Sequence, residues 1–224
     1  MKFKVIFSIV AMFIGAVQFV SAQKTKLFSA KHKDTFYGFE PSLGRIENPS
    51  DLFNIENKKI HLFGPKPGYL ITKDSYKNFE LRAQYCWNLD STITQKPGKK
   101  NSGLMYLVPH GTKDTLWPKG FQYQIKEGGT GDFVLLQEVT VDVKGIKTTA
   151  GRSVTSARFL DAEKPLGEWN TIVITKSNGV IKQELNGLLV NEGTNPSINE
   201  GRILLQFEGY PIDFRKIYIR KKKK

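Results

Sequence analysis

Apolar and polar positions alternate over short windows along most of this chain. In 79–87 every odd position is apolar, while the even positions hold Glu, Arg, Gln and Cys. The same period of two recurs at 121–126 and 202–208. Because successive side chains of a strand point to opposite faces, this pattern predicts half-buried β-strands. Further strands are expected at 59–63, 69–72, 103–108, 132–144, 171–176, 180–185 and 212–219.

Turn signals separate these windows, and helical periodicity is missing from the sequence. Asn178-Gly179 and Asn186-Gly187 each stand between two predicted strands, and Asn-Gly favours tight hairpin turns because both residues tolerate positive φ. No window of about 11 residues or more has a helical apolar pattern, and only 48–52 suits a single helical turn. The chain is therefore predicted to be all-β: a single-domain jelly-roll β-sandwich of two antiparallel sheets.

The first 22 residues have the features of a secretory signal peptide. Lys2 and Lys4 precede an apolar run that ends near Val20, and small residues at Val20 and Ala22 suit cleavage after Ala22. The run is interrupted by polar residues and is short for a membrane span. We therefore expect a signal peptide at 1–22, a domain at 23–224, a secreted or periplasmic location and no membrane span.

Charge and cysteine content narrow the possible partners. The 224 residues carry a formal net charge of +13, which could indicate a nucleic-acid partner, a membrane partner or only a soluble basic surface. Secretion argues against nucleic acid. The single cysteine, Cys86, excludes an intrachain disulfide and a cysteine-based zinc site. Because Cys86 lies within a predicted strand, we expect a buried, unreactive thiol.

The polar faces of two predicted strands suggest sugar binding. The strand at 121–126 presents Gln122 and Gln124, and the strand at 202–208 presents Gln206 and Glu208. Amide and carboxylate groups can hydrogen-bond to sugar hydroxyls, and Trp117, just before the first of these strands, could stack on a sugar ring. An ordinary solvated sheet face would show the same pattern.

Ionisable residues near these strands are candidates for acid–base chemistry. Glu127 and Asp132 flank a glycine-rich turn that lacks the Lys-Ser/Thr of a phosphate-binding loop. Their carboxylates could act as acid, base or metal ligands, so no cofactor is certain and a divalent metal is possible; a purely structural turn is the alternative. His110 lies in a loop close to Trp117 and is a candidate ligand contact.

Several longer motifs carry a family resemblance. They occur in order at 67–82 (PGYLITKDSYKNFELR), 101–104 (NSGL), 117–133 (WPKGFQYQIKEGGTGDF), 167–170 (GEWN), 185–187 (LNG) and 201–209 (GRILLQFEG), with Phe214-Arg215 after them. On these motifs the chain resembles the domain-of-unknown-function 1080 family, also called the 3-keto-disaccharide hydrolase domain. The resemblance extends from about residue 27 to 219.

The resemblance implies a concanavalin A-like jelly roll in a secreted bacterial protein of carbohydrate metabolism. It implies cleavage of the glycosidic bond of 3-keto-glycosides, with an oxidised disaccharide or glycoside as the carbohydrate partner. In that chemistry the base would be Glu127, Asp132 or Glu208, the acid His110, and the enolate partner Lys126 or Arg215. Sugar binding would fall to Asn101, Trp117, Gln122, Gln124 and Gln206.

Two departures from the family pattern leave alternatives open. The family usually has Glu at the position of Gln122, and often Arg or His at that of Leu107. An amide keeps the shape and hydrogen bonding of a carboxyl group but cannot transfer a proton. The alternative is therefore a non-catalytic carbohydrate-binding module that uses the same face, and a third reading is a scaffold without a sugar site. Geometry discriminates between these readings: if Glu127, Asp132 and Glu208 do not converge on one cleft with the two glutamines, the catalytic hypothesis loses its base.

Overall fold

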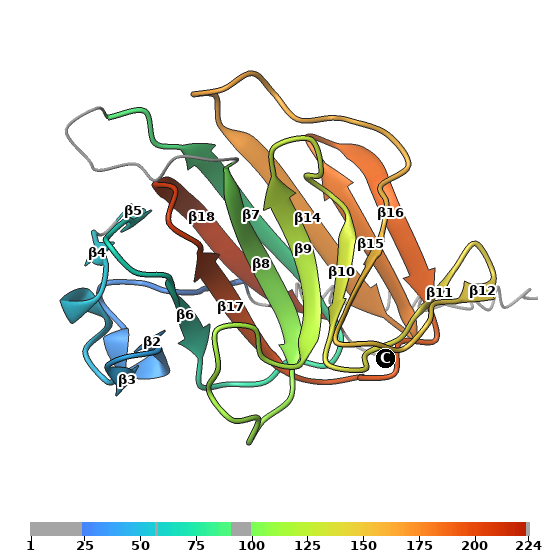
Figure 1. Ribbon diagram of the computed structural model, residues 1–224, viewed down its shortest axis with the longest axis horizontal. Helices are drawn as coiled ribbons and strands as arrows, with labels where there is room; N and C mark the ends of the chain where they lie inside the picture. The colour runs from blue at the N-terminus through green and yellow to red at the C-terminus, as the bar shows by residue number, and fades with distance from the viewer. Residues whose placement is uncertain (1–23, 57, 91–99, 223–224) are drawn as a thin grey trace, which may run out of the picture.

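The computed structural model describes residues 24–56, 58–90 and 100–222. Two antiparallel sheets lie face to face, and the only helical elements among the described residues are two short 3-10 turns, η1 (Lys33–Thr35) and η2 (Pro49–Asp51). Figure 1 shows the eight-stranded sheet in front, with β8, β9 and β17 at its centre, and the strands of the other sheet behind it. The predicted all-β sandwich of two antiparallel sheets is confirmed.

The rear sheet has ten strands and places β18 and β7 at its centre. Its order is β12-β11-β16-β15-β14-β7-β18-β5-β4, and β1 pairs with β18. The strands are β1 (Lys24–Lys26), β4 (Asn54–Ile55), β5 (Lys59–Leu62), β7 (Phe79–Trp87), β11 (Asp142–Val143), β12 (Ile146–Lys147), β14 (Asn170–Ser177), β15 (Val180–Leu185), β16 (Leu188–Thr194) and β18 (Ile212–Lys221).

The front sheet has eight strands in the order β13-β10-β9-β8-β17-β6-β2-β3. Its strands are β2 (Phe36–Glu40), β3 (Gly44–Ile46), β6 (Gly68–Thr72), β8 (Asn101–Val108), β9 (Gly120–Lys126), β10 (Phe133–Leu136), β13 (Ser153–Ser156) and β17 (Arg202–Phe207). Neighbours such as β8 and β17 are far apart in sequence, so the sheet gathers residues from the middle and the end of the chain.

The main core lies between the sheets and follows the predicted alternation. The odd positions of β7 are buried in it, as are Phe121, Tyr123 and Ile125 of β9 and Ile203, Leu205 and Phe207 of β17. The even positions of the same strands therefore point away from the core. Cys86 is buried on β7, in line with the expected strand-bound thiol.

The turns agree with expectation, whereas one predicted strand was wrong. Asn178 and Asn186 have φ of 49° and 53° before glycines that also have positive φ, as tight hairpins require. The predicted strand at 132–144 is instead two strands in different sheets, β10 and β11. Gln137 and Glu138 have φ of 58° and 66°, so the chain turns there and crosses between the sheets.

Two predictions fall on parts of the chain outside the described residues. The predicted signal peptide at 1–22 lies wholly outside them, and so does most of the predicted loop at 88–101. Within the described ranges, no helix has the length and apolar character needed to cross a membrane.

Candidate functional site

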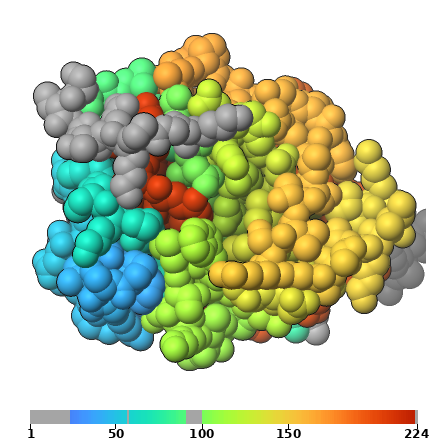
Figure 2. Space-filling view, in the orientation of Figure 1, coloured from blue at the N-terminus to red at the C-terminus, as the bar shows by residue number. Residues whose placement is uncertain are grey.

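The outward face of the front sheet carries a second apolar cluster instead of an ordinary solvated surface. It consists of Tyr37, Phe39, Tyr69, Ile71, Met105, Val108, Val134, Leu136 and Leu204. The loop at 109–119, between β8 and β9, crosses this face, and its Leu116 and Trp117 help to enclose a pocket of about 830 Å³. That volume is typical of a small-molecule site. In the space-filling view, the red segment at the end of β17 is visible at the surface, between segments coloured teal and green (Figure 2).

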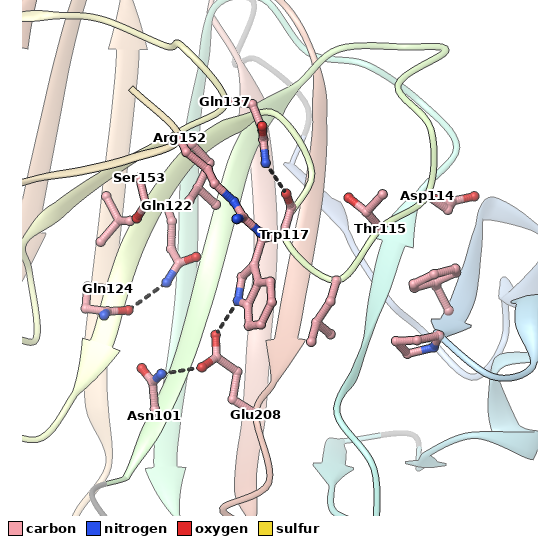
Figure 3. A pocket seen from close by; sticks show the side chains of 15 residues that line it. Asn101, Asp114, Thr115, Trp117, Gln122, Gln124, Gln137, Arg152, Ser153 and Glu208 are labelled. Carbon is pink, nitrogen blue, oxygen red and sulfur yellow. Dashed lines mark hydrogen bonds between the residues drawn. The ribbon is translucent and has the colours of Figure 1, made fainter. Parts of the chain in front are cut away.

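Neighbouring strands supply the polar floor of this pocket. Asn101 begins β8, Gln122 and Gln124 lie on β9, and Glu208 follows β17; all four line the pocket. Gln124 is opposite Gly103 in the β8–β9 register, and Asn101 is the next outward position along β8. Figure 3 shows these side chains facing a common space beside the Trp117 indole.

Glu208 is the carboxylate of the floor, and both of its oxygens accept hydrogen bonds. Its Oε1 accepts a hydrogen bond from Trp117 Nε1 at 3.0 Å, and its Oε2 accepts one from Asn101 Nδ2. Burial raises the pKa of the Glu208 carboxyl group, although the Trp117 hydrogen bond and the charge of Lys126 oppose this rise. A raised pKa suits a carboxyl group that exchanges protons near neutral pH.

Three amide oxygens of this region have no hydrogen-bond donor. Asn101 Oδ1, Gln122 Oε1 and Gln206 Oε1 are buried and unpartnered among the described residues. Gln206 lies below the pocket, and its Nε2 donates to Leu116 O at 3.4 Å. Because a buried acceptor without a donor costs free energy, the oxygens of the two lining residues, Asn101 and Gln122, favour a ligand rich in hydroxyl groups.

A glycine makes room for Gln122. A Cβ atom at Gly103 of β8 would lie only 2.6 Å from Gln122 Cδ, so only glycine lets this side chain lie across the neighbouring strand. There Gln122 Nε2 donates to Gln124 Oε1 at 2.6 Å. The Asn-Ser-Gly start of β8 therefore places both Asn101 and, through its glycine, Gln122.

Asp114 ties the loop at 109–119 to the sheet. Its Oδ1 accepts hydrogen bonds from Tyr69 at 2.6 Å and Tyr37 at 2.9 Å. Arg202 donates to the Tyr37 hydroxyl at 2.8 Å and to Pro109 O at 3.3 Å, so the start and the middle of the loop are both held. Burial, followed by the contact with Asp114, raises the pKa of both tyrosines, which therefore stay neutral donors.

Six of the predicted site residues gather at the pocket. Five line it, namely Asn101, Trp117, Gln122, Gln124 and Glu208, and Gln206 supports it from below. Lys126 is half-buried and opposite Asn101 in register, close enough for its charge to act on Glu208, but it is not a lining residue. Trp117 stands at the pocket with 44% of its surface exposed, as a side chain that stacks on a ligand would.

The other four predicted residues do not converge on the pocket. Glu127 pairs with Lys100 at 3.4 Å, and Asp132 accepts a hydrogen bond from the Arg158 amide at 2.8 Å, which fits the structural reading of their turn. His110 is exposed on the loop and does not line the pocket. Arg215 lies on the rear sheet, where it bonds to Gln84. The three carboxylates therefore do not converge: Glu127 and Asp132 are removed as candidate bases, and Glu208 is the one of the three that lines the pocket.

Sequence patterns did not reveal several lining residues. Asp114, Arg152, Ser153 and Gln137 come from loops and an edge strand that carry no alternating pattern. Within the described residues, no group of three or more His, Cys, Asp or Glu side chains could hold a metal ion. The ionisable side chains that line the pocket are those of Asp114, Arg152 and Glu208.

The profile of one protein family, described as 3-keto-alpha-glucoside-1,2-lyase-like domain, matches residues 23–220. The chain belongs to this family. The match spans nearly all of the predicted domain and confirms the resemblance carried by the sequence motifs. No curated protein matches the chain in sequence.

Solved structures show that the fold is a jelly roll, which this chain shares with several proteins whose names refer to carbohydrates. A Parabacteroides distasonis protein, described provisionally as a glycosyl hydrolase, aligns with a TM-score of 0.60 at 18% identity over 89% of this chain and 94% of its own. A Bacillus licheniformis β-glucanase aligns at 0.53 and 11%, covering 92% and 100%. The Bacillus subtilis carbohydrate-binding module CBM66 aligns at 0.50 and 14%, covering 75% and 89%. At these identities the likeness shows the fold alone.

Proposed function

We propose that this chain cleaves the glycosidic bond of a 3-keto-glycoside by elimination, with Glu208 as the proton carrier. The carrying observation is that the lining carboxylate Glu208 is held by two residues of the pocket itself, Trp117 and Asn101, and that burial raises its pKa. The other lining carboxylate, Asp114, is bonded to two tyrosines of the sheet. Ordinary glycosidases need two carboxylates beside the scissile bond. A pocket in which one carboxyl group faces the ligand space and the other serves the loop suits a reaction that needs one proton carrier.

The chemistry of a 3-keto sugar supplies such a reaction. The ketone acidifies the proton on C2, and a base removes it while the C3 oxygen takes up the negative charge. The enolate then re-forms the C3 carbonyl, a C1–C2 double bond forms, and the C1–oxygen bond breaks. The departing oxygen takes a proton, so the base can return the one it removed. Addition of water to the unsaturated product would give net hydrolysis.

The pocket residues have distinct parts in this proposal. The raised pKa of Glu208 makes its carboxylate a stronger base and lets the protonated form act as the acid in the second step. Arg152 is the only cation among the lining residues and would stabilise the enolate oxygen. Asn101 and Gln122 would accept hydrogen bonds from sugar hydroxyls through their unpartnered oxygens. Trp117 would stack against the ring.

A non-catalytic carbohydrate-binding module is the second candidate. It is favoured by Gln122, an amide that lines the pocket and cannot carry a proton, at a position where the family resemblance implies a glutamate. Its orphaned Oε1, with that of Gln206, would serve binding equally well without chemistry. A binding module would take up the glycan without turnover, and Gln122→Glu would leave that affinity unchanged.

The test is incubation with the 3-keto form of a nitrophenyl glucoside. The parent protein should release nitrophenol, Glu208→Gln should bind the substrate without releasing it, and Arg215→Lys on the other sheet should behave as the parent. Binding without release by the parent, at every pH and with divalent metals added, would support the module instead. Absence of binding would refute a sugar pocket altogether.

We also propose export of the protein before it acts. The support is the charged start, apolar run and small residues of the segment 1–22. Expression of the full chain in a bacterial host, followed by cell fractionation and N-terminal sequencing, should find the protein outside the cytoplasm with Gln23 as its first residue. Uncleaved protein in the cytoplasm would refute this.

A further inference from the structure

The positive charge of the chain is concentrated away from the pocket. The pocket lining holds one cation, Arg152, against two carboxylates, although the chain has a net charge of +13. The outward face of the rear sheet is on the opposite side of the sandwich. There, three neighbouring strands, β1, β18 and β7, form a second cleft of about 340 Å³.

Basic side chains dominate this cleft, which we call the rear cleft. Its lining consists of Lys24, Glu80, Arg82, Tyr218 and Arg220. Arg220 is opposite Lys24 on one side and Glu80 on the other, and Tyr218 is opposite Arg82. Lys24 Nζ lies 3.9 Å from the centre of the Tyr218 ring, which holds this ammonium group in place over the cleft.

The cations of the rear cleft lack anionic partners. Among the described residues, none of Lys24, Arg82 and Arg220 has a carboxylate within 4.0 Å, and Glu80 is the only acid of the lining. Lys182 on the same sheet, by contrast, pairs with Glu192 at 3.1 Å. Three close positive charges repel one another, and a bound anion would relieve that repulsion.

The basic surface continues along β18 beyond the rear cleft. Arg215 is opposite Lys59 of β5, and both cations lie over the Trp169 ring, at 3.8 Å and 6.0 Å. Because β18 has a bulge between Arg215 and Tyr218, Arg215 and Arg220 both face outward. Their partners on β7, Gln84 and Glu80, are four residues apart, which corresponds to roughly 13 Å at a rise of about 3.3 Å per residue. A row of cations of this length matches a chain of negative charges better than a single small anion.

We propose that the outward face of β1, β18 and β7 binds an anionic polysaccharide. No large exposed apolar side chain of the described residues lies on these three strands, so the apolar anchor of a membrane-surface site is missing. Lys24 covers the Tyr218 ring and Arg215 the Trp169 ring, so neither ring is open for stacking by nucleic-acid bases. Carboxylate or sulfate groups on a sugar chain, by contrast, would need only the cations of this face in order to bind.

Gel electrophoresis through immobilised polymers tests this inference. The probes are polygalacturonate, dextran sulfate, neutral dextran, a DNA duplex and phosphatidylglycerol vesicles, with the full chain as parent. The double variant Arg82→Gln/Arg220→Gln removes two exposed cations of the rear cleft. The matched control, Lys147→Gln/Lys164→Gln, removes two exposed cations elsewhere. Lys24→Gln is a single variant that alters the same cleft, and melting temperatures check that all variants fold.

The expected result is retardation by at least one anionic polysaccharide, weakened by salt and absent with neutral dextran. The double variant should bind about tenfold more weakly, Lys24→Gln a few fold more weakly, and the control like the parent. Equal losses in the control and the double variant would overturn the inference, as would no retardation by either polymer, or tighter binding to DNA or vesicles. Release of nitrophenol from the keto-glucoside should be unchanged in all variants, so this result is independent of the pocket proposal.

Discussion

The replacement of Glu208 by glutamine is the sharpest perturbation of the proposed chemistry. Glutamine keeps the size of the side chain but removes the group that exchanges protons. General acid–base catalysis contributes about 10²–10⁴-fold, so we expect kcat to fall by about 10³-fold, which corresponds to about 4 kcal/mol of activation free energy. Because the sugar contacts of Asn101 and Gln122 remain, the KM should change little.

The pH dependence of the parent's activity gives a second test of Glu208 as the proton carrier. Burial raises the pKa of Glu208, so the acidic limb of kcat/KM should lie above the pH at which an ordinary glutamate titrates, and no such limb should remain in the residual activity of Glu208→Gln. A stopped assay of nitrophenol release, buffered across the pH range, measures both. Full activity of Glu208→Gln with an unshifted acidic limb would refute the assignment of Glu208 as the proton carrier.

Stability should respond to the same carboxyl group with a defined sign. A folded-state pKa above the unfolded value means that the stabilisation is present at low pH and is lost as the pH rises through the folded pKa. The melting temperature of the parent, relative to that of Glu208→Gln, should therefore fall as the pH rises from the range in which an ordinary glutamate titrates through the raised folded-state pKa. A relative rise over that interval would contradict the raised pKa.

Three further substitutions test the architecture of the site. Asp114→Asn weakens the acceptor for the hydroxyl groups of Tyr37 and Tyr69. We expect the free energy of unfolding to fall by about 1–3 kcal/mol and the KM to rise more than kcat falls. An unchanged KM would show that the loop does not position the sugar. Gly103→Ala puts a Cβ atom 2.6 Å from Gln122 Cδ. Calorimetry should show weaker sugar binding and a loss of about 1–3 kcal/mol in the free energy of unfolding. Sugar binding equal to that of the parent would show that Gln122 does not contact the sugar. Arg215→Lys should leave kcat/KM unchanged in the nitrophenol assay, because Arg215 lies on the other sheet, and a large loss would show that our placement of the site is wrong.

Alternation along the strands was enough to predict the sandwich and the outward faces. Gln122 and Gln124 point away from the core because Phe121, Tyr123 and Ile125 point into it. The alternation, however, shows which side chains point away from the core and does not show to which of the two sheets a strand belongs. Arg215 on β18 and Glu208 after β17 both occupy outward positions of the alternating pattern, yet the two strands belong to opposite sheets. Only the strand order, which arises from pairing between distant segments, separates them.

Residues beyond the strand ends could not be placed from the pattern. Glu127 and Asp132 flank a turn in which Gly128 and Gly131 have positive φ, and Asp132 is held by the Arg158 amide, 26 residues away in sequence. Asp114 enters the site because a long loop folds back over β2 and β6. These contacts depend on tertiary packing, whereas the family motifs located the strands that carry the floor of the pocket.

The most direct test of the central claim is a kinetic isotope effect at C2. The parent protein would be assayed with a nitrophenyl 3-keto-glucoside that carries hydrogen or deuterium at C2, alongside the unoxidised glucoside. Elimination through Glu208 predicts slower release from the deuterated substrate and no cleavage of the unoxidised one. Equal rates for the two isotopic forms, together with cleavage of the unoxidised glucoside, would contradict removal of the C2 proton.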